Sequence, residues 1–184
     1  MPSAQAPKHA EGKGASQAPT GEERLFLDTN LFVYAAGVPL EEKDSTLQEL
    51  EAAAQAIVLA LGEERITGVT SLVVLQEILY LFHRWDQARR MPALRDTGRQ
   101  VVADALALVK EVLTPTFLEF QRAFTAYDPH RDDFNDLLIL EAMRTHRIQR
   151  IVTADRGFTR HPDITVLDPR EYRKQLKPSE EDSR

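Results

Sequence analysis

Leu25-Phe26-Leu27-Asp28-Thr29-Asn30 joins a short apolar run to an aspartate and two polar residues. The apolar run is typical of a buried strand, and Asp28 stands where that strand would end. Three further acidic residues stand beside apolar segments later in the chain: Glu77, Asp136 and Asp155. Four carboxylates at comparable positions predict one shared pocket, in which they would repel one another unless a divalent cation were bound.

The bulk composition predicts one soluble domain. A chain of 184 residues is long enough for one substantial core and short for two. It has no cysteine, which excludes disulfides and thiolate zinc sites, and its five histidines show no metal-ligand spacing. With no apolar stretch long enough to span a bilayer and no apolar signal core, we expect a cytoplasmic protein. The net charge of -6 disfavours bulk coating of nucleic acid but allows local binding.

Both ends of the chain are expected to be disordered tails. Residues 1–22 contain mainly Ala, Pro, Gly, Ser, Gln and Lys, and residues 177–184 are similarly polar. Such segments bury too little apolar surface to offset the entropy lost on ordering. We therefore expect a single domain over residues 23–176.

Between the tails, short apolar runs alternate with longer helical patterns. Strands are predicted at 24–28, 65–69, 112–114, 150–153 and 164–167. Helices are predicted at 31–36, 47–61, from 70 or 71 to about 85, at about 96–109, at 116–126 with a Thr116–Glu119 capping box, and from 132 or 133 to 145. This order predicts an α/β domain with a mainly parallel sheet flanked by helices.

The four acids are expected to converge at one edge of this sheet. In open parallel sheets, sites form at the carboxyl ends of the strands, where the next helices begin. Asp28 and Asp155 stand at such ends, Asp136 lies in the first turn of its helix, and Glu77 lies about two turns into its own. A cluster of carboxylates in this place suits Mg²⁺ or Mn²⁺.

Each acid also has an ordinary structural explanation. Asp28 and Asp155 could be turn or cap residues. Glu77 could be a solvated helical side chain, and Asp136 could simply stabilise the start of a helix through its dipole. The four acids together are much harder to explain in this way.

At these positions the sequence resembles the PIN domain family. The four motifs of that family are matched in order by Leu25–Asn30, Thr70–Glu77, Asp136–Ile139 and Ile151–Phe158. Each motif alone is unspecific, whereas four in order at plausible spacing are specific. The resemblance covers about residues 24–172, and the size and plan of the chain are similar to those of VapC-type toxins from toxin–antitoxin pairs.

This resemblance implies a Rossmann-like sheet and a ribonuclease that depends on Mg²⁺ or Mn²⁺. The implied catalytic and metal-binding acids are Asp28, Glu77, Asp136 and Asp155. Asn30 and Thr153 would give polar support, and Asp133 would either cap its helix or compete with Asp136 for the metal role. The resemblance also implies a homodimer and a cognate antitoxin protein as partner.

A group of arginines could bind the RNA substrate. The helical region after Glu77 carries Arg84, Arg89, Arg90, Arg95 and Arg99, with Trp85 and Met91 among them. Such a strip could grip an RNA backbone and stack a base, or it could be a solvated surface with Asp86 and Asp96 as partners. Arg156 and Arg160 follow Asp155, the acid of the fourth motif, and are better candidates for phosphate contacts.

Three other functions are compatible with part of the acidic motif pattern. Phosphatases that use an aspartate nucleophile normally need a second acid two positions later, where this chain has Asn30. An RNA-processing PIN nuclease without an antitoxin, or a non-catalytic PIN-like scaffold that binds RNA or a partner, would share the fold. Because all four acids are present, catalysis is favoured over the scaffold.

Overall fold

A five-stranded parallel sheet forms the centre of the molecule. The computed structural model describes residues 24–37, 44–131 and 133–176, and its strands lie in the order β3-β2-β1-β4-β5. Their bounds are Arg24–Leu27 (β1), Thr67–Ser71 (β2), Glu111–Leu113 (β3), Arg150–Val152 (β4) and Thr165–Leu167 (β5). Every described strand pairing is parallel, which confirms the predicted fold class.

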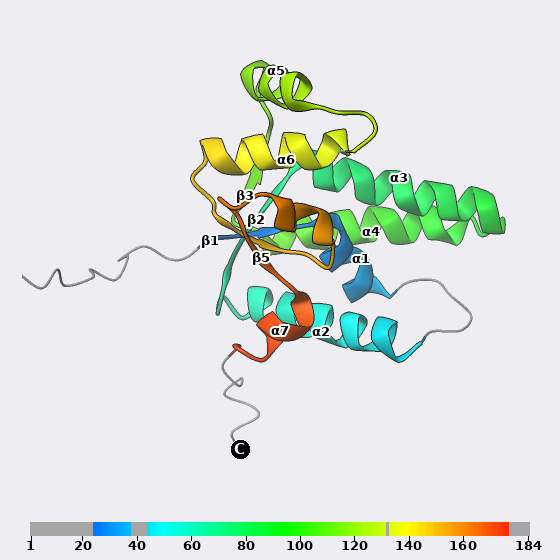
Figure 1. Cartoon of the computed structure of the whole chain (residues 1–184). Helices are drawn as coiled ribbons and strands as arrows, with labels where there is room; N and C mark the ends of the chain where they lie inside the picture. The colour runs from blue at the N-terminus through cyan, green and yellow to red at the C-terminus, as the bar shows by residue number, and fades with distance from the viewer. Residues whose placement is uncertain (1–23, 38–43, 132, 177–184) are drawn as a thin grey trace, which may run out of the picture.

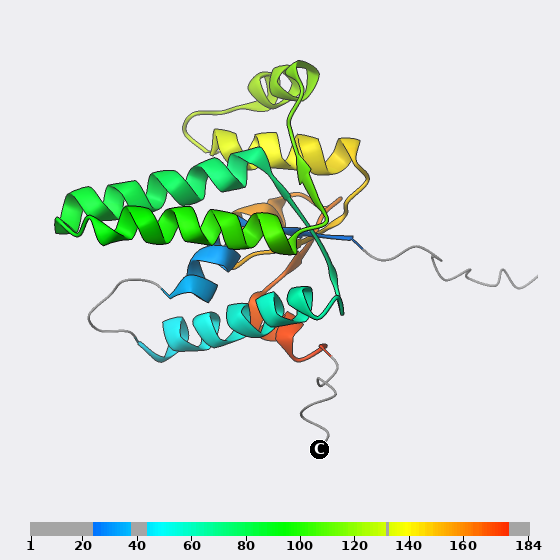
Figure 2. The same cartoon turned by 180° about the vertical axis from the view of Figure 1, so that it is seen from behind.

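Helices cover both sides of the sheet. They are α1 Thr29–Ala36, α2 Ser45–Gly62, α3 Leu72–Arg89, α4 Ala93–Leu108, α5 Phe117–Ala126, α6 Phe134–Thr145, the 3₁₀ helix η1 Arg156–Arg160 and α7 Pro169–Arg173. Figures 1 and 2 show α5 and α6 stacked on one side and α2 with α7 on the other, whereas α3 and α4 extend outward as a paired hairpin.

Polar side chains set where most helices begin. Asp28, Asp44, Ser71, Thr116, Asp133 and Asp168 each accept a hydrogen bond from a backbone N–H of the turn that follows. The predicted Thr116–Glu119 capping box is present in full. Ser71, one of the two predicted caps for the second long helix, is the one used. These caps place several acids and hydroxyls at the carboxyl ends of strands.

Element ends differ from the predictions where tertiary pairing decides them. β2 runs from Thr67 to Ser71 and not from 65 to 69, because its pairing with β1 begins at Arg24 opposite Thr67 and its pairing with β3 ends at Ser71 opposite Leu113. α3 continues to Arg89, where Arg90 adopts a left-handed conformation and ends it. The short helices η1 and α7 were not predicted.

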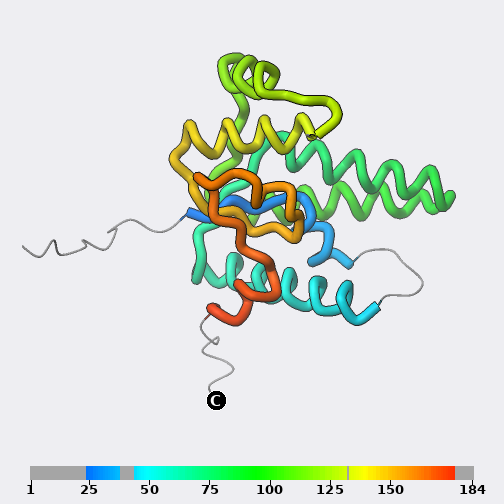
Figure 3. The backbone as a smooth tube through the Cα atoms, viewed as in Figure 1, coloured from blue at the N-terminus to red at the C-terminus, as the bar shows by residue number. Residues whose placement is uncertain are grey.

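The core lies between the central strands and the helices. Phe26, Leu27, Ile151 and Val152 are fully buried, and Phe26 pairs with Ile151 across β1 and β4. In Figure 3, β1 (blue) therefore runs beside β4 (yellow-orange), although the two strands are far apart in the sequence. Gly68 in β2 allows the approach of α2, since a Cβ there would lie 2.6 Å from both Leu27 Cδ1 and Leu61 Cδ2.

The expected tails and the expected lack of a membrane span are considered only against the described residues. The tails predicted at 1–22 and 177–184 lie outside the described residues. Among the helices of the described part, none combines the length and the apolar character needed to cross a bilayer.

Candidate active site

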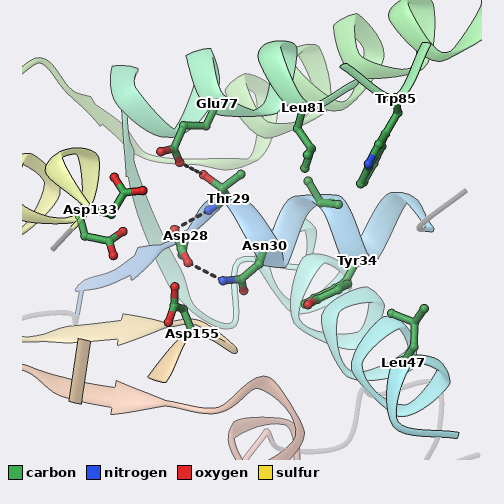
Figure 4. Close-up of a pocket in the computed structure, with 12 residues that line it drawn as sticks. Asp28, Thr29, Asn30, Tyr34, Leu47, Glu77, Leu81, Trp85, Asp133 and Asp155 are labelled. Carbon is green, nitrogen blue, oxygen red and sulfur yellow. Dashed lines mark hydrogen bonds between the residues drawn. The ribbon is translucent and has the colours of Figure 1, made fainter. Parts of the chain in front are cut away.

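A cavity of about 520 Å³ opens at the carboxyl ends of the central strands. The site residues predicted from the sequence that line it are Asp28, Asn30, Glu77, Asp133, Asp136 and Asp155. The cavity is also lined by Thr29, Val33, Tyr34, Leu47, Leu81 and Trp85. The four predicted acids therefore share one cavity although they come from four segments of the chain, as Figure 4 shows for Asp28, Glu77 and Asp155.

Asp28 is held in place by hydrogen bonds to both carboxylate oxygens. It follows β1 directly and is only 6% exposed. Its Oδ1 accepts from the backbone N–H of Thr29 at 2.7 Å. Its Oδ2 accepts from Asn30 Nδ2 at 2.5 Å and from Thr153 Oγ1 at 2.6 Å. The orientation of this carboxylate is thus determined before any ligand binds.

Asn30 and Thr153 connect α1 with the end of β4. Asn30 Nδ2 donates also to Thr153 Oγ1 at 2.7 Å, and Asn30 Oδ1 accepts from the backbone N–H of Ala154 at 3.0 Å. Thr153 is buried, and its hydroxyl also accepts from the backbone N–H of Asp155 at 2.9 Å. The network joins the segments that carry Asp28 and Asp155, and it gives both predicted supporting residues defined contacts with the acids.

Glu77 is bound by two polar residues that the sequence had not singled out. Thr29 Oγ1 donates to Glu77 Oε2 at 2.5 Å, and Asn135 Nδ2 donates to Oε1 at 2.7 Å. Thr29 and Asn135 stand beside Asp28 and Asp136 in the chain, so their adjacency to the acids was the available signal. The two contacts fix Glu77 between α1 and α6.

The remaining acids stand at the starts of helices. Asp133 caps α6 by accepting from the backbone N–H of Asn135 at 2.8 Å, and it also lines the cavity. Asp155 caps η1 through the backbone N–H of Gly157 at 2.6 Å. A Cβ on Gly157 would lie 3.1 Å from Asp155 Oδ1 and 3.7 Å from Asp136 Oδ2, so both acids approach this glycine closely.

Crowding of the acids changes their ionisation. The pKa of Asp28 is raised to about 6, mainly by burial and in smaller part by the charges on Glu77 and Asp155, whereas hydrogen bonds from Thr153 and Thr29 act to lower it. Burial raises the pKa of Asp136 to about 7, with added contributions from its acidic neighbours, of which Asp28 is the largest. A bound cation would relieve this repulsion.

The chemistry of the donor set fits a hard divalent cation. The lining side chains offer carboxylate oxygens, which Mg²⁺ and Mn²⁺ prefer. In the described part of the chain, no group of three or more His, Cys, Asp or Glu side chains is already arranged to hold an ion. Each oxygen of Glu77 accepts one hydrogen bond, from Thr29 or from Asn135, and keeps a second lone pair that could bind an ion.

The sequence matches a known protein family. The model of the PIN domain matches residues 25–164, which is most of the chain. The chain belongs to the PIN domain family. The match includes Asp28, Glu77, Asp136 and Asp155, and it confirms the resemblance seen in the sequence.

Two relatives of this PIN domain carry VapC names. Ribonuclease VapC13 of Mycobacterium tuberculosis is 28% identical over 144 residues, which are 78% of this chain and 98% of the relative. VapC ribonuclease Mb1869c of Mycobacterium bovis matches with the same identity over the same shares.

Two solved structures share the fold. VapC20 of Mycobacterium tuberculosis, described as a sarcin-ricin loop cleaving toxin, has a TM-score of 0.55 at 18% identity, covering 75% of this chain and 95% of its own. VapBC2 from Rickettsia felis, bound to a DNA fragment from their promoter, has a TM-score of 0.51 at 17% identity, covering 78% and 97%.

The arginines suggested for RNA binding lie outside the cavity lining of this PIN domain. Arg84 lies over the Tyr80 ring at 5.9 Å, and Arg89 is exposed near the end of α3. Arg156 and Arg160 are exposed in η1, where Arg160 Nη1 donates to the Arg131 carbonyl at 3.0 Å.

One of the arginines on the α3–α4 hairpin forms an ion pair within the protein. Arg95 forms an ion pair with the buried Asp86, one of the two partners expected for a solvated surface. Arg95 is thus engaged in the α3–α4 hairpin, and RNA contact by the other arginines stays a prediction.

Proposed function

We propose that this PIN domain is a ribonuclease of the VapC type that hydrolyses RNA phosphodiester bonds with the help of Mg²⁺ or Mn²⁺. The observation that carries the proposal is the convergence of Asp28, Glu77, Asp136 and Asp155 on one cavity. The raised pKa values of Asp28 and Asp136 support it, because they are typical of carboxylates that are buried and lie beside other acids in one site.

In this proposal the acids hold the ion and the substrate phosphate lies against it. Asp28, Glu77, Asp136 and Asp155 would be the ligands, and Asn30 and Thr153 would orient Asp28. When bound, the ion would supply a water of lowered pKa and neutralise charge on the phosphate oxygens. Asn30 stands where an aspartyl-phosphate enzyme would need its second acid, so Asp28 is assigned to binding and not to nucleophilic attack.

The toxin role and its partner follow from the relatives. The relatives are named VapC ribonucleases, and one structural neighbour is a VapBC complex. We assign the chain to the toxin of such a pair, with a small antitoxin as its inhibitor. A short reading frame for a DNA-binding protein beside the gene, whose product copurifies with this chain, is the expected observation; a gene without such a neighbour would favour an RNA-processing role.

A second copy of the chain is the other proposed partner. α5 exposes an apolar face made of Phe117, Leu118, Phe120 and Phe124, with exposed fractions of 44% to 74%. Several exposed apolar side chains on one short helix are typical of an interaction surface.

The test of the nuclease is cleavage of a broad RNA panel with Mg²⁺ or Mn²⁺. Cleavage is expected with either ion and is expected to fall at least a hundredfold in Asp28→Asn, because an acid that would bind the ion is neutralised. Asp104→Asn is the matched control, since Asp104 is exposed on α4 and accepts only from Gln100 Nε2 among the described contacts. Full activity in Asp28→Asn, or none in the parent with any divalent ion, would contradict the proposal.

A further inference from the structure

The cavity has two chemically different halves. Figure 4 shows the acids Glu77, Asp133 and Asp155 toward one end, and Leu81, Trp85, Tyr34 and Leu47 toward the other. The proposed function uses only the acidic half. The aromatic half needs a separate explanation, because apolar side chains that line an open cavity are available to a ligand.

Helical spacing builds both halves from the same two helices. Glu77, Leu81 and Trp85 are spaced four residues apart on α3 and therefore lie on one face. Asn30 and Tyr34 have the same spacing on α1. Each helix thus presents a polar residue near the acids and an aromatic ring one or two turns further on, so the two halves are continuous.

The Trp85 ring is held against the core. It packs edge-on against Phe82, with ring centroids 5.1 Å apart and an angle of 75° between the planes. Phe82 is buried, and it lies so close to α4 that a Cβ on Gly98 would be 2.7 Å from Phe82 Cβ. Trp85 therefore lines the cavity and is packed against a core residue.

Tyr34 supplies the second ring and a hydroxyl. It is half-buried, and its pKa is raised by burial and then by the charges on Asp28 and Asp155. The phenol stays neutral at neutral pH and keeps its hydroxyl proton for donation. Val33 is buried beneath this part of the wall, and the half-buried Leu47 completes it from α2.

We propose that the Tyr34–Trp85 half is a subsite for one unpaired nucleobase of the RNA. The inference rests on the proposed function, which places the substrate phosphate in the acidic half. A nucleotide joins an anionic phosphate to a flat ring, and the cavity joins an ion-binding acidic half to an aromatic wall. Stacking on aromatic rings is a main way in which proteins hold unpaired bases. The subsite would also require the RNA to be single-stranded at the cleavage position.

The experiment uses the fluorescence of Trp85, which is the single tryptophan of the chain. The full chain is titrated in Mg²⁺ with each nucleoside 5′-monophosphate and with ribose 5-phosphate, which has the phosphate but no base. N-acetyltryptophanamide corrects for absorption by the nucleotides. Saturable quenching by nucleotides and none by ribose 5-phosphate is expected. Equal responses to both would overturn the proposal.

Variants locate the binding. Tyr34→Leu keeps the reporter and is expected to weaken nucleotide binding about tenfold, the effect of losing one stacking ring. The same variant is expected to raise KM for RNA cleavage with little change in kcat. Tyr80→Leu is the matched control, because Tyr80 is an aromatic residue on α3 that is 61% exposed and does not line the cavity. Unchanged binding in Tyr34→Leu would overturn the proposal.

Two outcomes separate this proposal from its rivals. If N-acetylphenylalaninamide changes the Trp85 emission saturably and nucleotides do not, the aromatic half is a site for a protein side chain and the proposal fails. If nucleotides quench but the chain cleaves no RNA, the base subsite stands and the proposed nuclease activity fails. If the chain cleaves RNA but nucleotides do not quench Trp85, the nuclease activity stands and the base subsite fails.

Discussion

At the residue scale, the acids serve structure and candidate chemistry together. Asp28, Asp133 and Asp155 all cap helices, which is the ordinary structural role expected of them from the sequence. They also line the cavity with Asp136 and Glu77. The two explanations were treated as alternatives in the sequence, but a cap at the carboxyl end of a strand is already at the edge where sites form.

The crowded acids are expected to cost stability when no ion is bound. The pKa of Asp136 is about 7, above its ordinary value of 3.8, so the folded protein binds the proton more tightly than the unfolded chain does. Stability from this group is complete below about pH 4 and is lost as the pH rises toward 7 and 8. In EDTA, the free energy of unfolding should therefore fall over this range.

Asp136→Asn tests this cost. At pH 8 in EDTA the variant is expected to be more stable than the parent by about 1–2 kcal/mol, less than the whole pKa shift would give because the side chain is partly solvated. The difference should shrink toward pH 5, and urea unfolding at both pH values measures it. Asp104→Asn should change stability by less than about 0.5 kcal/mol. A variant that is less stable than the parent at pH 8 would contradict the explanation.

At the element scale, close helix packing positions the aromatic wall. α3 and α4 form the hairpin that Figures 1 and 2 show extending from the sheet. Gly98 lets α4 approach Phe82, which in turn supports Trp85. No sequence pattern indicated this function for Gly98, because a glycine within a helical pattern is first interpreted as a residue that lowers helix stability.

Gly98→Ala is expected to destabilise the hairpin. The added Cβ would meet Phe82 Cβ at 2.7 Å and Cγ at 3.0 Å, and overpacking should exceed the helix propensity gained, for a net loss of about 1–2 kcal/mol. Thermal unfolding and a shifted Trp85 emission report it. Gly62→Ala is the matched control, since its Cβ would lie 3.5 Å from Leu108 Cδ2 in ordinary contact, and it should be neutral or stabilising. Equal effects of the two variants would exclude this packing explanation.

At the scale of the whole molecule, the apolar face of α5 lies far from the face covered by α2. Phe120 stacks on Phe124 with centroids 6.3 Å apart, and it meets Phe134 of α6 edge-on at 5.2 Å. The patch is thus an ordered aromatic surface, while Figure 1 places α5 at the outer edge of the fold. Burial against a second copy would remove this surface from water.

Phe124→Glu is expected to break the proposed homodimer. Phe124 is 64% exposed, so the charge should leave folding nearly unchanged while it opposes burial in an interface. Light scattering after size exclusion should give a dimer for the parent and a monomer for the variant. Leu59→Glu, at a residue of α2 that is 57% exposed, should remain dimeric. A monomeric parent would refute the homodimer.

Much of the fold could be predicted because its signals are local. Apolar runs, helical spacing and cap residues are written in neighbouring positions, so the parallel sheet and most helices were found. The ends of β2 and α3 were missed because strand pairing and the packing of α3 on α4 set them. The helices η1 and α7 are short, and five residues carry too little periodicity to predict a helix.

The sequence by itself determined the family, the parallel α/β plan and the identity of the acids, since each depends on residue types in a fixed order. Only the tertiary structure decided that Thr29 and Asn135 bind Glu77, that Asn30 and Thr153 join two strand ends, and that Tyr34 and Trp85 share a wall. These contacts join residues far apart in the chain. Their partners are chosen by packing and strand register, which no local pattern specifies.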